Sequence, residues 1–241
     1  MKNYAYTRHQ RGFTLVEIAI VLMIIGLLIG GILRGQELIQ SARVRNLIDQ
    51  KSAVQTAYIG FLDRYRMLPG DLTAAQAAVV GNGALSATGT LNGDGLILWN
   101  LDSIVFFQNL TAAGFISCGA CMTVTGVGTP EPFNTLVNVY GDYVVVAHQN
   151  SSNTGGSWFD PAPAPGINRF FMGTGGSVPS QVQAEVDRKA DDGLPGTGQL
   201  RYHQMRTSAT AAVCAPGMTT TPAVSRWANP NQDNCAGAWL L

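Results

Sequence analysis

Charged side chains are scarce in this sequence. Only 12% of the 241 residues are charged, about half of the roughly 25% found in ordinary soluble domains. The 15 basic and 15 acidic residues balance, so the formal net charge is zero. A chain without a basic surplus is not expected to bind nucleic acid over its whole surface. Hydrophobic residues make up 46% of the chain, which excludes an intrinsically disordered protein.

The balanced charge hides a segregation along the chain. Residues 1–12 carry three basic residues and no acidic one, Lys2, Arg8 and Arg11. Residues 13–66 carry six basic and four acidic residues, whereas residues 67–241 carry six basic and eleven acidic ones. We therefore expect three regions in different surroundings: a basic leader, a mildly basic stem and an acidic globular head.

Proline is absent before Pro69, and charge is almost absent between residues 13 and 33, where Glu17 is the only charged residue. As a helix these residues would be about 31 Å long, enough to cross the hydrocarbon core of a bilayer. Basic residues precede them, so the positive-inside rule places residues 1–12 in the cytoplasm and residues 34–241 outside. A secretory signal peptide is the alternative, but residues 30–36 contain no convincing small-x-small cleavage site.

Glu17 does not fit an ordinary membrane helix. A carboxylate in a membrane segment costs about 2.5–3.5 kcal/mol on insertion scales. The next opposite charge along its own helix is Arg34, more than four turns away. The sequence therefore predicts that the partner of Glu17 comes from another chain or from a newly made positive group.

Residues 11–17, which read Arg-Gly-Phe-Thr-Leu-Val-Glu before the apolar run, resemble the prepilin signature of type IV pilins and type II secretion pseudopilins. The resemblance implies that prepilin peptidase, a membrane aspartyl protease, cuts between Gly12 and Phe13 and methylates the new N-terminal Phe13. It also implies that Glu17 pairs with the N-terminal amine of a neighbouring subunit, which supplies the missing cation. Gly12 suits a cleavage site because a residue without Cβ lets a protease approach the backbone. An ordinary signal anchor with a chance glutamate is the alternative.

The resemblance carries a set of expectations about function. It implies a structural subunit of a type IV pilus or secretion pseudopilus, whose partners are prepilin peptidase, other pilin or pseudopilin subunits and the inner-membrane assembly machinery. The precursor would lie in the bacterial inner membrane and the processed chain in a periplasmic or cell-surface filament. The large head favours a minor or specialised subunit. A tip-located adhesin or substrate-binding minor pilin is the alternative, with nucleic acid disfavoured as its ligand because the head is acidic.

The helical pattern continues beyond the apolar run. Apolar residues recur at helical spacing and form one stripe: Val44, Leu47, Val54, Tyr58, Phe61 and Tyr65. A helix over residues 13–66 would be about 81 Å long, and its first half needs lipid or other copies of the chain to cover it. Gly26 and Gly30, like Gly31 and Gly35, are spaced for close helix approach. The resemblance offers a second interpretation, local melting of this stretch on assembly.

Residues 67–241 predict an α+β head, so the expected fold class is a long helix packed on a small antiparallel sheet. Turn residues bound each predicted element. We expect helices at 73–80, 103–113 and 179–190, with Asp102 as an N-cap, and strands at 136–140, 143–148, 167–172 and 199–206. Long loops are expected at 151–166 and 207–225.

The four cysteines predict disulfides, because the head is expected in an oxidising compartment. Three pairings are possible, and proximity along the chain favours Cys118–Cys121 with Cys214–Cys235. Zinc binding by Cys118 and Cys121 is an alternative, but no second CxxC or histidine pair accompanies them. A thioredoxin-like role would need a βαβ context that the sequence does not show.

Two acidic segments are candidates for calcium, and pseudopilins that bind calcium do so in loops of the head. One segment, residues 92–95, holds Asn92 and Asp94, but the EF-hand ligand positions before and after it fall on Thr90 and Leu101. The other cluster is Asp187, Asp191 and Asp192. Tight acidic turns are the favoured interpretation of both, so no cofactor is required. No catalytic motif occurs, and we do not expect an enzyme.

Overall fold

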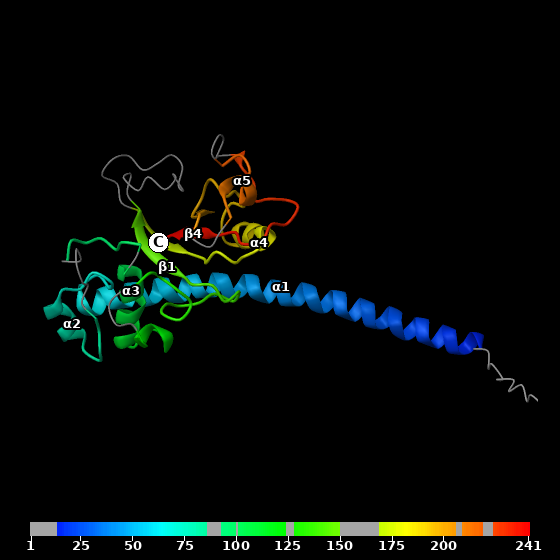
Figure 1. The fold of residues 1–241 in the computed structure, drawn as a ribbon, viewed down its shortest axis with the longest axis horizontal. Helices are drawn as coiled ribbons and strands as arrows, with labels where there is room; N and C mark the ends of the chain where they lie inside the picture. The colour runs from blue at the N-terminus through cyan, green and yellow to red at the C-terminus, as the bar shows by residue number, and fades with distance from the viewer. Residues whose placement is uncertain are drawn as a thin grey trace, which may run out of the picture. The chain divides into compact units, whose positions relative to one another are not determined.

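A computed structural model describes residues 14–85, 93–99, 101–123, 128–149, 169–205, 209–218 and 224–241. The expected leader, with Gly12 and Phe13, lies outside the described residues, and so does Asn92. The chain divides into two compact units, Met1–Ala42 and Arg43–Leu241, and helix α1 (Leu15–Tyr65) contributes to both. The predicted α+β architecture is confirmed: a long apolar helix, a small antiparallel sheet and short helices (Figure 1).

The second half of α1 is part of the core of the globular unit. The predicted stripe is buried at Val44, Leu47, Val54 and Phe61, while Tyr58 and Tyr65 pack half-buried against the same cluster. The second compact unit accordingly begins at Arg43, within α1. After Tyr65 the chain turns, with a left-handed φ of 56° at the next residue.

The sheet has four antiparallel strands in the order β1-β2-β4-β3. They are β1 (Val145–Gln149), β2 (Arg169–Gly173), β3 (Leu200–Tyr202) and β4 (Gly237–Leu240). Three of them fall within or next to predicted strands, although β3 is much shorter than residues 199–206. The C-terminal strand β4, which the sequence analysis missed, lies between β2 and β3 and pairs with both.

The strand predicted at residues 136–140 is wrong. Only a single bridge, between Val137 and Tyr143, joins this segment to the next. Asn138 makes the chain turn instead, because its side-chain oxygen accepts the amides of Tyr140 and Asp142. Its side-chain amide then donates to the carbonyl oxygen of Thr174 at 2.7 Å, which fastens the turn to the segment after β2.

Among the described residues the three helices predicted for the head are present, and two short helices are added to them. They are α2 (Ala74–Val80), α3 (Leu101–Ala112), η1 (Ala120–Thr123), α4 (Ser180–Ala190) and α5 (Ala211–Cys214). Asp102 is not the N-cap of α3 but lies inside its first turn. The short helix α5 forms within residues 207–225, where a loop is predicted.

Two apolar clusters cover the two faces of the sheet. The larger joins α1, α3 and the sheet, with Phe106, Val146, Met172 and Trp239 among its buried members. The second, on the opposite face, contains Tyr143, Val145, Ala147, Phe171 and Ala238. Alternation of consecutive residues of β1 between the two clusters is what a strand covered on both faces requires. The sheet therefore packs against α1 and α3 on one face and against a smaller apolar cluster on the other.

Candidate functional site

The first half of α1 exposes apolar side chains all round. Leu15, Met23 and Leu27 are between 75% and 91% exposed, and the other large apolar side chains from Val16 to Ile39 are at least 45% exposed. Among the described residues, α1 is the one helix long and apolar enough to cross a membrane. So large a continuous apolar surface marks a membrane-binding or protein-binding segment.

Glu17 has a partner in its own first turn, Thr14. The backbone amide and the hydroxyl of Thr14 donate to Oε2 of Glu17 at 2.8 and 2.9 Å, and the Glu17 amide donates to the Thr14 hydroxyl at 3.2 Å. This reciprocal pattern is a capping box. The Thr-x-x-Glu spacing of residues 14–17 was the signal in the sequence that could have revealed this capping box. Thr14 satisfies hydrogen bonds but brings no positive charge.

Arg34 is engaged locally as well. Its guanidinium lies 3.0 Å from a carboxylate oxygen of Glu37, one turn further along α1, and both side chains are exposed. An exposed pair of this kind contributes little stability. Arg34, the first cation of α1 after Glu17, is thus paired with Glu37. The carboxylate of Glu17 therefore has no counterion on its own helix.

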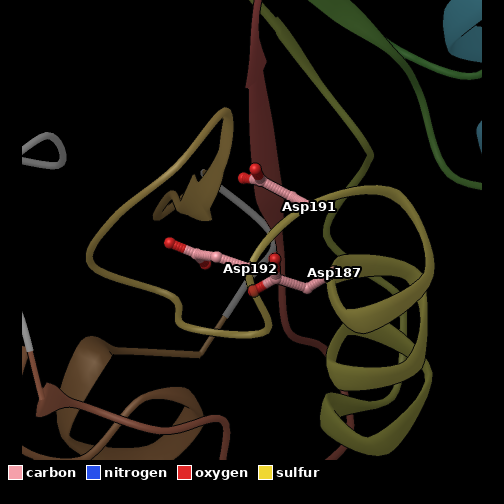
Figure 2. Close-up of side chains that lie close together, drawn as sticks. All are labelled: Asp187, Asp191 and Asp192. Carbon is pink, nitrogen blue, oxygen red and sulfur yellow. The ribbon is translucent and has the colours of Figure 1, made fainter.

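The acidic residues Asp187, Asp191 and Asp192 come together at the C-terminal end of α4. Figure 2 shows the three side chains on the side of the helix that faces the following loop, and each offers an oxygen within 4.8 Å of the others. Asp187 is fully buried. Burial, together with the negative charges of Asp192 and Asp191, raises the pKa of Asp187 to about 6, although hydrogen bonds from Trp227 and Gly193 act in the opposite direction.

The three carboxylates accept hydrogen bonds from the loops around them. Asp187 accepts from the Trp227 indole at 2.7 Å and from the Gly193 amide at 3.1 Å. Its two neighbours accept from the loop and from the start of β3: Asp191 from the amides of Gln199 and Leu200, and Asp192 from the Leu194 amide and the Thr197 hydroxyl. At one oxygen each, the three carboxylates supply three of the six to eight oxygens that calcium takes, so carbonyl groups or water would have to supply the others. Calcium binding here stays the less favoured alternative of the sequence analysis.

The second calcium candidate forms a tight turn at its described residue, Asp94. Oδ1 of Asp94 accepts the amide of Leu96 at 2.9 Å, two residues on, the pattern of an Asx-turn. The neighbouring Gly93 and Gly95 have left-handed φ values of 76° and 82°, and their amides donate to Asp71. Asp94 therefore shapes the turn to which it belongs.

Comparison with known proteins bears on the N-terminal segment. Residues 7–33, which include Gly12, Phe13 and Glu17, match the family model of the prokaryotic N-terminal methylation motif. The chain carries the prokaryotic N-terminal methylation motif. This motif is the signature of type IV pilins and pseudopilins, a structural rather than an enzymatic family. No curated protein and no solved structure matches the chain.

The motif supports a type IV pilin or pseudopilin-like subunit. It implies processing by prepilin peptidase and assembly with other pilin subunits, and together with α1 it fits a membrane-anchored precursor. The glycines of this pilin-like helix are compatible with close contact between subunits. A Cβ added at Gly26, Gly30, Gly31 or Gly35 would meet no atom within 4 Å, so packing within the chain does not require them. Melting of this stretch on assembly stays a prediction.

The four cysteines of the head are paired as Cys118–Cys121 and Cys214–Cys235. The thiols that zinc would need are thus joined to each other. Cys118 and Cys121 are buried in the main core at the start of η1. Cys214, at the end of α5, is tied to Cys235, whose backbone bridges to Val178 just before α4. The second disulfide therefore fixes the C-terminal loop to the sheet and to α4.

Removal of the Cys214–Cys235 disulfide should destabilise the head substantially. Closing a loop with a sequence separation of 21 is worth about 3 kcal/mol in the chain-entropy account. We expect Cys214→Ala with Cys235→Ala to lower the free energy of unfolding by about that amount in urea titrations of the full chain in detergent. The matched control, Cys118→Ala with Cys121→Ala, opens a loop with a separation of only 3 and should cost less. Equal losses in the two double variants would contradict this ranking.

The two histidines of the described head are part of its structure. His203 is buried against the rings of Trp99 and Phe171, at centroid distances of 5.8 and 4.7 Å. Burial lowers the pKa of His203 to about 3, so this ring is neutral at physiological pH. His148, at the end of β1, accepts a backbone hydrogen bond through Nδ1. His148 lies in β1 and His203 directly follows β3, so both rings are engaged within the fold of the head.

Proposed function

We propose that this chain is a structural subunit that prepilin peptidase cleaves between Gly12 and Phe13. Its N-terminal helix would then assemble into a type IV pilus or a secretion pseudopilus. The observation that carries the proposal is the combination of the methylation motif over residues 7–33 with an apolar surface on α1 that stays exposed among the described residues. Other copies of such a helix are the natural cover once the subunit leaves the bilayer.

Charge and redox chemistry support one orientation of the precursor. Lys2, Arg8 and Arg11 precede the apolar helix, which supports a cytoplasmic leader and an outward head. Two disulfides in the head support an oxidising compartment. The processed subunit would reside in a periplasmic or cell-surface filament after extraction from the bacterial inner membrane by the assembly machinery.

We further propose a minor or specialised role for this subunit. The globular unit, Arg43–Leu241, is large for a simple building block and carries a disulfide-closed loop at its C-terminal end. The quantity of the subunit in filaments distinguishes the roles, because a major subunit coats the filament and a tip subunit is present in traces.

Mass spectrometry of sheared filaments tests the assignment directly. We expect the filament fraction to contain the chain with a methylated Phe13 as its first residue, at a small molar ratio to the main subunit. An uncleaved chain found only in the membrane fraction, in cells that make filaments, would contradict the proposal. A ratio near one or above would retain the pilin assignment and overturn the minor role.

A further inference from the structure

Side chains hold the backbone of residues 93–98 in place. Five amides of this short segment donate to titratable side chains over distances of 2.7–3.1 Å: Gly93 and Gly95 to Asp71, Leu96 to Asp94, Ile97 to His148, and Leu98 to Asp102. One of its residues, Ile97, is fully buried in the main core. Hydrogen bonds to ionisable side chains, among them His148 and Asp102, therefore hold this part of the core.

The acceptor of Ile97 is the imidazole of His148. Nδ1 accepts the Ile97 amide at 2.9 Å, and the His148 amide donates to the Ile97 carbonyl oxygen at 2.7 Å. Because Nδ1 is the acceptor, the neutral ring carries its proton on Nε2. A proton added at Nδ1 would turn the acceptor into a donor that faces another donor. This hydrogen bond therefore exists only while His148 is neutral.

Burial lowers the pKa of His148, and the negative charges of Asp71 and Asp94 oppose that shift. From β2 the facing residue is Phe170, whose ring centroid lies 4.9 Å from the imidazole. The cation of β2, Arg169, is in register with Gln149 instead. A base whose pKa is lowered by folding stabilises the closed segment at pH values above its ordinary pKa of about 6.5. That stabilisation is lost as the pH falls below this value.

Asp102 has the opposite dependence. It is 1% exposed and accepts the Leu98 amide at 2.7 Å. Burial raises the pKa of Asp102 to about 7, the Leu98 hydrogen bond lowers it, and the negative charges of Asp71 and Asp94 raise it. An acid whose pKa rises on folding stabilises the closed segment most at low pH. That stabilisation decreases as the pH rises from about 3.9 towards 7.

We propose that residues 93–98 form a pH-compensated latch, in which the titrations of His148 and Asp102 act in opposite directions on the same segment. Below about pH 6.5, protonation of His148 removes the acceptor of the Ile97 amide. Protonation of Asp102 removes the buried negative charge beside Leu98. Each effect alone changes the opening equilibrium by up to about tenfold per pH unit, since each involves one proton. Together they hold the segment closed over a range of weakly acidic pH.

Amide hydrogen exchange of the full chain in detergent tests the latch at pH 6.5 and 5.5. Exchange rates of residues 95–98 are divided by the intrinsic rate at each pH. We expect the wild type to change by less than about threefold. His148→Asn keeps an acceptor but does not titrate, so protection should rise on acidification. Asp102→Asn keeps the acceptor for Leu98 without the charge, so protection should fall. Each single variant should move by up to about tenfold.

The double variant, with both asparagines, completes the experiment. It should return to a nearly flat profile, and contributions from Asp187 and His203 cancel because all four proteins share them. Single variants that follow the wild type, or that both move in the same direction, would overturn the compensation. If His148→Asn does not fold, as near-ultraviolet circular dichroism would show, Asp102→Asn alone still decides, because an unchanged profile in that variant overturns the proposal.

Discussion

Replacement of Glu17 by glutamine should stop the subunit from entering filaments while cleavage after residue 12 continues. Glutamine fits the capping box with Thr14 as well as glutamate does, so the start of α1 should be preserved. What the variant loses is the negative charge expected to meet the N-terminal amine of a neighbouring subunit. Removal of one partner from a buried ion pair costs about 3–5 kcal/mol. We therefore expect at least a hundredfold less subunit in the sheared filament fraction, measured by immunoblot against the membrane fraction.

Thr14→Val provides the matched control, because it removes the capping side chain and keeps the charge. Loss of an N-cap costs about 1 kcal/mol, so incorporation should fall only modestly. The two variants separate the roles of Glu17 that the structure and the motif suggest. Normal incorporation of Glu17→Gln would contradict charge pairing between subunits. Equal loss in both variants would indicate that the helix start, and not the charge, is what assembly requires.

Replacement of Gly12 by valine should leave the chain as an uncut precursor in the membrane. The absence of a Cβ at Gly12 lets the protease approach the scissile peptide bond, and a branched side chain would obstruct it. We expect the variant to migrate on a denaturing gel as a species heavier by residues 1–12, with no subunit in the filament fraction.

Gly35→Ala is the matched control for this processing experiment. It changes a glycine of α1 whose added Cβ would meet no atom within 4 Å, so cleavage should proceed as in the wild type. Cleavage of Gly12→Val at the normal site would contradict the recognition of this glycine. Blocked cleavage of both variants would indicate a general defect in membrane insertion.

Much of the fold could be predicted because its signals are local. The stripe from Val44 to Phe61 predicted the face that α1 buries, and it is buried. The capping pair Thr73 and Gln76 begins α2, where the sequence predicts that helix. Prediction failed where a distant contact decided the outcome. The strand expected at 136–140 is replaced by a turn because the Asn138 side chain bonds the chain on both sides of it and reaches Thr174.

The sequence by itself determined the N-terminal segment of this protein. A methylation motif and an uninterrupted apolar run are contiguous, so composition and spacing reveal them without any knowledge of the fold. Only the tertiary structure decided the middle position of β4 in the sheet, and it alone gathered Asp71, Asp102 and His148 around residues 93–98. The reason is physical: these contacts join residues far apart in the chain, and they form only when the whole core closes.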